Sequence, residues 1–105
     1  MSDLEKNIYV SSLYNFYKNL LTEKQRDIFY SYYYLDIGLT EIGVELNISR
    51  QAVLDSIKKT ENILKTYEDK IGLYKLYNEQ TKIIEDINSE KDLHKLNQIL
   101  KLWEG

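Results

Sequence analysis

The chain of 105 residues contains no cysteine and no proline, only four glycines and a single histidine. Without cysteine it can form neither a disulfide framework nor a thiolate metal site. Proline and glycine interrupt helices, so their scarcity favours long continuous helices. No apolar run approaches the roughly 20 residues that a membrane-spanning helix needs. We therefore expect an all-α protein with no membrane partner.

The N-terminus and the length indicate where such a protein works and how it is organised. The first residues, MSDLEKN, are acidic and lack the basic region of a signal peptide, so we expect a cytoplasmic protein. The length fits one domain with a helical extension. A core of this size is modest, and self-association would add to its stability.

Capping residues predict where the first helices begin and end. Ser2 and Thr22 are each followed three residues later by Glu or Gln, the pattern of a capping box. Gly38 is expected to end the second helix in a left-handed conformation, and Thr40 to cap a short third helix. Ser49 is expected to cap a fourth helix that runs to residue 65 or beyond.

The stretch LNISRQAVLDSIKK, residues 46–59, has the features of the second half of a helix-turn-helix. In this motif two short helices cross steeply through a tight turn. Asn47 suits the positive φ of that turn, and Gly43 supplies a small residue where the helices approach. We expect Gly43→Leu to force the helices apart and Gly43→Ala to be mild. The residues expected to hold the motif together are Ile42, Gly43, Leu46, Ile48, Val53 and Ile57.

An ordinary helical corner within a bundle is the alternative interpretation, because such corners reuse the same packing. The outer face of the second helix favours the nucleic-acid interpretation. Arg50 and Gln51 suit the edges of guanine and adenine, and lysines on the same face suit phosphates. The candidate contact residues are Ser49, Arg50, Gln51, Leu54, Asp55, Lys58 and Lys59. A solvated helix surface without a partner is the alternative for this face.

The charge of the chain limits how strongly it can bind nucleic acid. The net formal charge is −3, with a pI near 5.2. Residues 49–65 carry +2, which leaves −5 for the rest of the chain. Phosphate contacts supply most non-specific affinity, so we expect a monomer to bind duplex DNA poorly. The alternative is a protein–protein interaction module that uses the helix-turn-helix only as a scaffold.

From Leu21 onward, the sequence LTEKQRDIFYSYYYLDIGLTEIGVELNISRQAVLDSIKKTENIL resembles the fourth region of bacterial sigma factors. The stretch ISRQAVLDSIKKTENILKTYEDK, with LTEKQ and YYYLD before it, is similar to the YlxM (UPF0122) family of small bacterial helix-turn-helix proteins. The similarity covers about residues 9–78, and the last thirty residues match no pattern that we can name. It implies a role near the signal recognition particle, with the particle's RNA or its GTPase as a partner.

The C-terminal third is expected to pack rather than to bind nucleic acid. Gly72 predicts a break, and Ser89 predicts the start of a last helix. Residues at heptad-like spacing follow on this helix: Leu93, Leu96, Leu100 and Trp103. An apolar seam of this kind marks an interface, so we expect it to pack on the core or on a second subunit, with a homodimer favoured. The predicted division is a helix-turn-helix domain over residues 1–70, with the motif at about 40–65, and C-terminal helices over 71–105.

The sequence argues against an enzyme and against a cofactor or metal site. No Gly-rich phosphate loop or GK[ST] motif is present. The single histidine, His94, lies near Asp92, but no nucleophile or second strong ligand stands at motif spacing. We therefore expect a sigma-like helix-turn-helix protein that binds DNA or signal recognition particle RNA as an accessory or regulatory protein.

Overall fold

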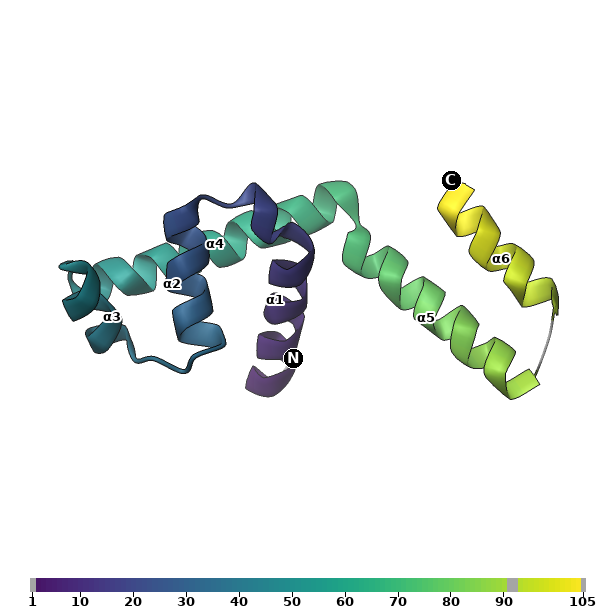
Figure 1. The fold of residues 1–105 in the computed structure, drawn as a ribbon, viewed down its shortest axis with the longest axis horizontal. Helices are drawn as coiled ribbons and strands as arrows, with labels where there is room; N and C mark the ends of the chain where they lie inside the picture. The colour runs from purple at the N-terminus through teal and green to yellow at the C-terminus, as the bar shows by residue number, and fades with distance from the viewer. Residues whose placement is uncertain (1, 91–92, 105) are drawn as a thin grey trace. The chain divides into compact units, whose positions relative to one another are not determined.

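The computed structural model describes the backbone of residues 2–90 and 93–104, and the side chains of residues 2–87 and 98–103. Within these residues every element is helical (Figure 1), which confirms the all-α prediction. The elements are α1 (Asp3–Tyr17), a 3-10 turn η1 (Lys18–Leu20), α2 (Glu23–Tyr33), α3 (Leu39–Leu46), α4 (Arg50–Ile71), α5 (Leu73–Glu90) and α6 (Leu93–Glu104). They form a first unit, residues 1–71, and a second unit, residues 72–105. None of the described helices is both long enough and apolar enough to span a membrane.

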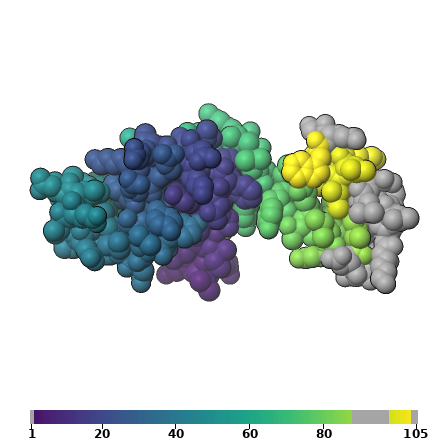
Figure 2. All heavy atoms as spheres, viewed as in Figure 1, coloured from purple at the N-terminus to yellow at the C-terminus, as the bar shows by residue number. Residues whose placement is uncertain are grey.

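The first unit is built around α4, the longest helix. Helices α1, α2 and α3 each pack against it, and their atoms cover much of it in the space-filling view (Figure 2). The side chains buried between them are Val10, Leu13, Tyr14, Tyr17, Leu21, Ile28, Phe29, Ile42, Val53, Ile57, Thr60 and Leu64. Aromatic rings fill the space between α1 and α2, where Phe29 stacks on Tyr14 and on Tyr33 with centroids 4.8 and 4.4 Å apart. The first unit therefore has a core of its own.

Two of the predicted helix starts are confirmed by their capping hydrogen bonds. The Thr22 hydroxyl accepts from the Gln25 backbone N–H at 3.1 Å, and the Gln25 side chain accepts from the Thr22 N–H at 3.0 Å. The Ser2 hydroxyl accepts from the Glu5 N–H at 3.2 Å. Each bond satisfies an N–H group that the first turn of a helix otherwise leaves without a partner.

The predicted ends around α3 are wrong. Gly38 has φ −69° and ψ 156° and is the N-cap of α3, so it does not end α2 and Thr40 does not cap α3. The left-handed residue after α2 is Asp36, with φ 55°, a conformation that Asp adopts more readily than most residues. The chain reverses there through the Ile37 N–H, which donates to the Ser31 carbonyl at 3.0 Å. Because Asp36 makes the turn, Gly38 is left in extended backbone.

The second unit consists of α5 and α6, which pack on each other. Gly72, with φ +74°, separates α4 from α5 as the sequence predicts. The predicted start at Ser89 is wrong, since Ser89 lies within α5 and α6 begins at Leu93. No proline or glycine stands between Leu73 and Glu90, and one serine is too weak a breaker to end a helix.

The predicted apolar seam of the last helix is largely exposed where it is described. Leu100 and Trp103 are 58% and 70% exposed, whereas Ile99 and Leu102 are half-buried. The side chains of Leu93 and Leu96 lie outside the described residues. Packing of this seam, on the core or on a second subunit, therefore stays a prediction.

Candidate nucleic-acid interface

The turn between α3 and α4 has the geometry of a helix-turn-helix. Asn47 adopts φ 57° and ψ 44°, the left-handed conformation expected for it. The Ile48 N–H then donates to the Gly43 carbonyl at 2.9 Å and closes the turn. Below the turn, Ile42 and two residues of α4, Val53 and Ile57, form one buried cluster with a residue of α2. The partly buried Ile48 packs against this cluster.

Gly43 of α3 lies close to the backbone of the turn that follows this helix. A Cβ atom at this position would be 2.7 Å from the carbonyl oxygen of Ile48 and 3.4 Å from the carbonyl carbon of Ser49. Real Cβ atoms essentially never lie 2.7 Å from another heavy atom. The backbone of a tight turn cannot move aside as a flexible side chain can. The expectation that Gly43→Ala is mild is therefore wrong, because even one methyl group meets the turn itself.

Leu46 was expected in the motif core and is 41% exposed instead. It lies four residues after Ile42 in a helix that ends at that point. Four residues turn an α-helix by about 400°, so the two side chains differ by about 40° around the axis. Leu46 instead lines a groove between α2 and α3, which Tyr30 also lines.

The first turn of α4 presents the candidate base-reading residues. The Ser49 hydroxyl accepts from the Ala52 N–H at 3.0 Å, so Ser49 caps the helix as predicted. Arg50 and Gln51 are exposed. The Gln51 amide donates to the Asp55 carboxylate at 2.9 Å. Arg50 therefore points into solvent at the helix start, and Gln51 is held against α4 by Asp55.

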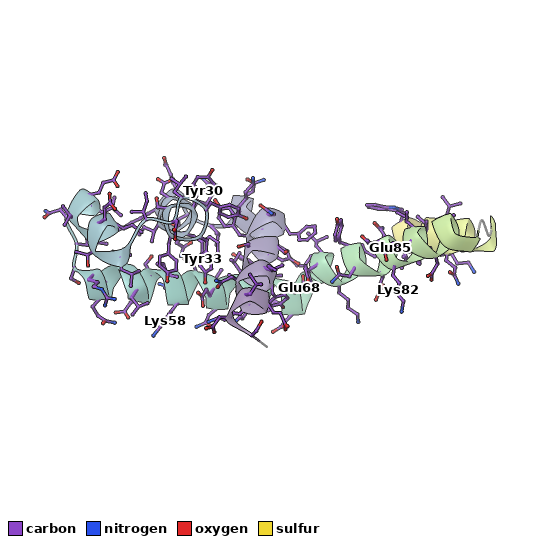
Figure 3. All side chains as sticks on the ribbon, turned by 90° about the horizontal axis from the view of Figure 1, so that it is seen from below. Tyr30, Tyr33, Lys58, Glu68, Lys82 and Glu85 are labelled. Carbon is purple, nitrogen blue, oxygen red and sulfur yellow. The ribbon has the colours of Figure 1, made fainter. Side chains whose placement is uncertain are left out.

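Lys58 and Lys59, which the sequence places on one face of the helix, border different hollows in the structure. Lys58 lies with the half-buried Leu54 beside a hollow of about 530 Å³ that Glu61 also lines. Lys59 borders a different hollow, with Thr22 at the start of α2. Adjacent helical residues differ by about 100° around the axis, so one lysine flanks each side of α4. Figure 3 shows Lys58 projecting from α4, and Tyr33 of α2 lines the same hollow as Lys58.

The motif as a whole carries no net charge. The cations in residues 39–59 are Arg50, Lys58 and Lys59, and the acids are Glu41, Glu45 and Asp55. All six side chains are exposed. The positive balance expected from residues 49–65 leaves α3 out of account, and α3 supplies two of the three carboxylates. Attraction to phosphates therefore depends on the placement of single cations.

A largely buried carboxylate that the sequence did not reveal joins three helices of the first unit. The Tyr33 hydroxyl donates to Glu61 of α4, and Lys6 of α1 lies 3.8 Å from the other oxygen of that carboxylate. The Glu61 side chain is only 12% exposed. Burial and the hydrogen bond to Glu61 raise the pKa of Tyr33. The sequence signal is weak, because nothing shows that residues 6, 33 and 61 meet until α1, α2 and α4 are packed.

No group of described residues offers three side chains that could hold a metal ion. The side chains of His94 and Asp92 lie outside the described residues.

Comparison with known proteins agrees with this geometry. The UPF0122 family model, described as "Putative helix-turn-helix protein, YlxM / p13 like", matches residues 4–103. The UPF0122 protein of Oceanobacillus iheyensis is 40% identical over 93% of this chain and 96% of its own length. That of Bacillus licheniformis is 44% identical over 85% and 83%, and that of Caldanaerobacter subterraneus is 49% identical over 76% and 68%. The likeness extends beyond residues 9–78, so the C-terminal residues also match a known pattern.

Proposed function

Because the chain belongs to the UPF0122 family of helix-turn-helix proteins, we propose that it is a nucleic-acid-binding accessory or regulatory protein of the bacterial cytoplasm. The family is described as one of helix-turn-helix proteins. The observation that carries the proposal is the first half of α4, where Arg50, Gln51 and Lys58 are exposed beyond the Gly43–Asn47 turn. None of the three belongs to the buried core.

Each residue of this surface has a proposed role. Arg50 pairs with a guanine edge, and Gln51 exchanges its bond to Asp55 for an adenine edge. Lys58 and Lys59 contact phosphates on the two flanks of α4, which suits a groove with a backbone on each side. Leu54 offers an apolar edge beside Lys58. Ser49 holds the helix start in place.

The signal recognition particle is the proposed setting of this activity. The resemblance to the YlxM family implies it, with the particle's RNA or a DNA site as the nucleic acid and the particle's GTPase as a further partner. This part of the proposal depends on the family rather than on any contact within the chain. It therefore requires a binding experiment with the particle RNA itself.

The test is a fluorescence titration against signal recognition particle RNA and a random duplex pool at two salt concentrations. Arg50→Ala should weaken binding by about 1–3 kcal/mol and relax the preference for one base. Lys58→Ala should weaken binding to all sequences alike and lower the salt slope by about one unit. Lys82→Ala, an exposed lysine of α5 (Figure 3), changes the net charge equally and should have little effect. Identical weak curves for all four proteins would reject the reading role.

The second candidate is a protein-interaction module that uses the helix-turn-helix as a scaffold. The neutrality of residues 39–59 and the net charge of −3 favour it. In that case neither RNA nor DNA binds above a non-specific background at physiological salt. The titration therefore decides between the two candidates.

We further propose a homodimer formed through the second unit. That unit has 34 residues, and a chain segment below about 40 residues rarely forms a stable core alone. Leu100 and Trp103 remain exposed in the single chain, and a second copy would cover them.

Light scattering at about tens of micromolar, a range in which weak dimers persist, tests the dimer. The wild type should have twice the mass of the chain, and Leu100→Asp combined with Trp103→Ser should have the mass of one chain. Lys101→Ala, at an exposed position between them, should remain a dimer. A monomeric wild type would overturn this proposal.

A further inference from the structure

A groove between α2 and α3 combines an apolar floor with an acidic rim. Ile28 and Ile42, which are 1% and 2% exposed, form the floor. Tyr30 and Leu46, 45% and 41% exposed, are the more open apolar side chains of its wall. Asp27, Ser31 and Glu45 complete the lining. Apolar surface flanked by carboxylates is complementary to a side chain that has an apolar stem and a positive head.

The groove opens away from the candidate nucleic-acid interface. Its floor residues belong to the cluster whose α4 members are Val53 and Ile57, and no residue of α4 lines it. Figure 3 shows Tyr30 on the side of α2 that is turned away from α4. The groove can therefore be occupied while α4 contacts another partner.

The aromatic wall is fixed before any partner arrives. The Tyr30 ring stacks on Tyr34, with centroids 5.1 Å apart. The Tyr34 hydroxyl is 3.2 Å from both the Ser11 carbonyl and the Asn15 side-chain oxygen on α1. A ring held in its bound position loses little conformational entropy on binding. Its face can also attract a cation that lies near it.

The charges of the rim are available to a partner. Neither Asp27 nor Glu45 forms an ion pair with a described residue, and both are exposed. Arg26, the nearest cation along α2, donates to the Lys18 carbonyl at 3.5 Å and does not line the groove. Phosphates would meet two carboxylates and no cation, so the electrostatics disfavour nucleic acid at this face.

We propose that the α2–α3 groove, lined by Tyr30, Leu46, Asp27 and Glu45, docks a basic amphipathic segment of another protein by one arginine or lysine next to an apolar side chain. The groove has a volume of about 260 Å³, slightly below the roughly 300–1,000 Å³ of sites for small molecules. This size fits the side chains of a short segment rather than a whole cofactor. Carboxylates on both walls can accept charge-assisted hydrogen bonds from a guanidinium or ammonium group.

A random peptide library displayed on phage and selected on the full chain tests the proposal. Enriched peptides should carry arginine or lysine beside Leu, Phe or Met. Fluorescence anisotropy with one enriched peptide should then show about tenfold weaker binding to Leu46→Ser and to Asp27→Asn combined with Glu45→Gln. Binding should also weaken as salt is raised, since rim charges are screened.

Matched controls exist on α3 itself. Val44→Ser removes an apolar side chain that is 77% exposed, and Glu41→Gln removes an exposed carboxylate, both outside the groove lining. Both controls should bind the peptide as the wild type does. The Asp27 and Glu45 substitutions keep side-chain shape, so they decide the matter if Leu46→Ser fails to fold. No enrichment, enriched peptides without a cation, or equal losses in the controls would overturn the proposal.

The outcome is independent of the nucleic-acid proposal. Arg50→Ala should leave peptide binding unchanged, because Arg50 does not line the groove. Peptide binding that is lost in Arg50→Ala but kept in the groove variants would place protein contact on α4 and overturn the groove proposal.

Discussion

The two units of the chain differ in where their apolar side chains are covered. All the fully buried hydrophobic residues of the described part belong to residues 1–71. In the second unit, Ile84, Leu100 and Trp103 are 47%, 58% and 70% exposed. Helices α5 and α6 of the second unit pack on each other, yet they leave these three side chains open to solvent. Amphipathic spacing shows that a helix face will be covered, but not which molecule covers it.

The largest expected difference between the units comes from removing one aromatic side chain from each. Phe29→Ala removes a ring that is fully buried between Tyr14 and Tyr33. This substitution should lower the free energy of unfolding of α1–α4 by about 3–5 kcal/mol. Trp103→Ala should leave α1–α4 within about 0.5 kcal/mol of the wild type. Hydrogen exchange read separately on peptides of each unit measures both effects, and equal losses in α1–α4 would abolish the distinction.

Glycine substitutions should separate a steric requirement from a backbone requirement. Gly43→Ala should lose about 1–3 kcal/mol and Gly43→Leu more, because the Cβ meets the Ile48 carbonyl. At Gly72 nothing lies within 4 Å, but φ is +74°, so Gly72→Ala should lose about 1–2 kcal/mol. Asparagine tolerates positive φ, so Gly72→Asn should recover most of that loss. Gly43→Asn should recover none, and urea unfolding of the five variants compares them.

Tyr33→Phe should lower the free energy of unfolding by about 1.5–3 kcal/mol, the range for hydrogen bonds to charged groups. The substitution removes the bond from α2 to the Glu61 carboxylate, which joins α1, α2 and α4. The folded state raises the pKa of Tyr33. The contribution of Tyr33 to the free energy of unfolding is therefore fully present below the ordinary tyrosine pKa of about 10. The unfolded chain deprotonates first above that pH, so stability is lost as pH rises.

Denaturant unfolding at pH 7 and at several values above 10 measures this effect. Tyr33→Phe should reduce the alkaline loss without removing it, because burial also raises the pKa of Tyr14 and Tyr34. Tyr32→Phe is the matched control, since no hydrogen bond joins its hydroxyl to a described residue. An unchanged alkaline slope in Tyr33→Phe would contradict the prediction.

The smallest expected effect is a gain at the start of α3. Gly38 caps this helix with extended backbone, no side-chain hydrogen bond and nothing within 4 Å of a Cβ. Gly38→Ser should therefore add about 0.5 kcal/mol through a new cap and a less flexible unfolded chain. Thr40→Ala should not lose a cap, because Thr40 lies inside the helix. A rise in melting temperature for Gly38→Ser alone would support the observed start of α3 over the predicted one.

The sequence predicts the features of the fold that depend on neighbouring residues. The capping box at Thr22, the N-cap at Ser2, the left-handed Asn47 and the break at Gly72 are predicted correctly, because each is determined within a few positions. The predictions for Gly38 and Thr40 are wrong because Asp36 makes the turn instead. Residue type alone favours glycine at such a position and does not distinguish it from Asp36. The exposure of the Leu46 side chain depends on how α2 packs against α3, and local sequence patterns do not determine that packing.

The candidate interface shows the same limit. Exposure of Arg50, Gln51 and Lys58 follows from helical periodicity, and the sequence predicts it. The bond from Gln51 to Asp55 and the separation of Lys58 from Lys59 depend on side-chain direction. The contact of Tyr33 with Glu61 joins residues 28 positions apart, which no local pattern contains.

The charge neutrality of residues 39–59 has a kinetic consequence. Basic surfaces draw nucleic acids through solution and raise association rates far above the unsteered range. A neutral motif provides little of this attraction, so encounters should proceed at about 10⁵–10⁶ M⁻¹s⁻¹ and change little with ionic strength. The lifetime of the complex would then govern how long a site stays occupied.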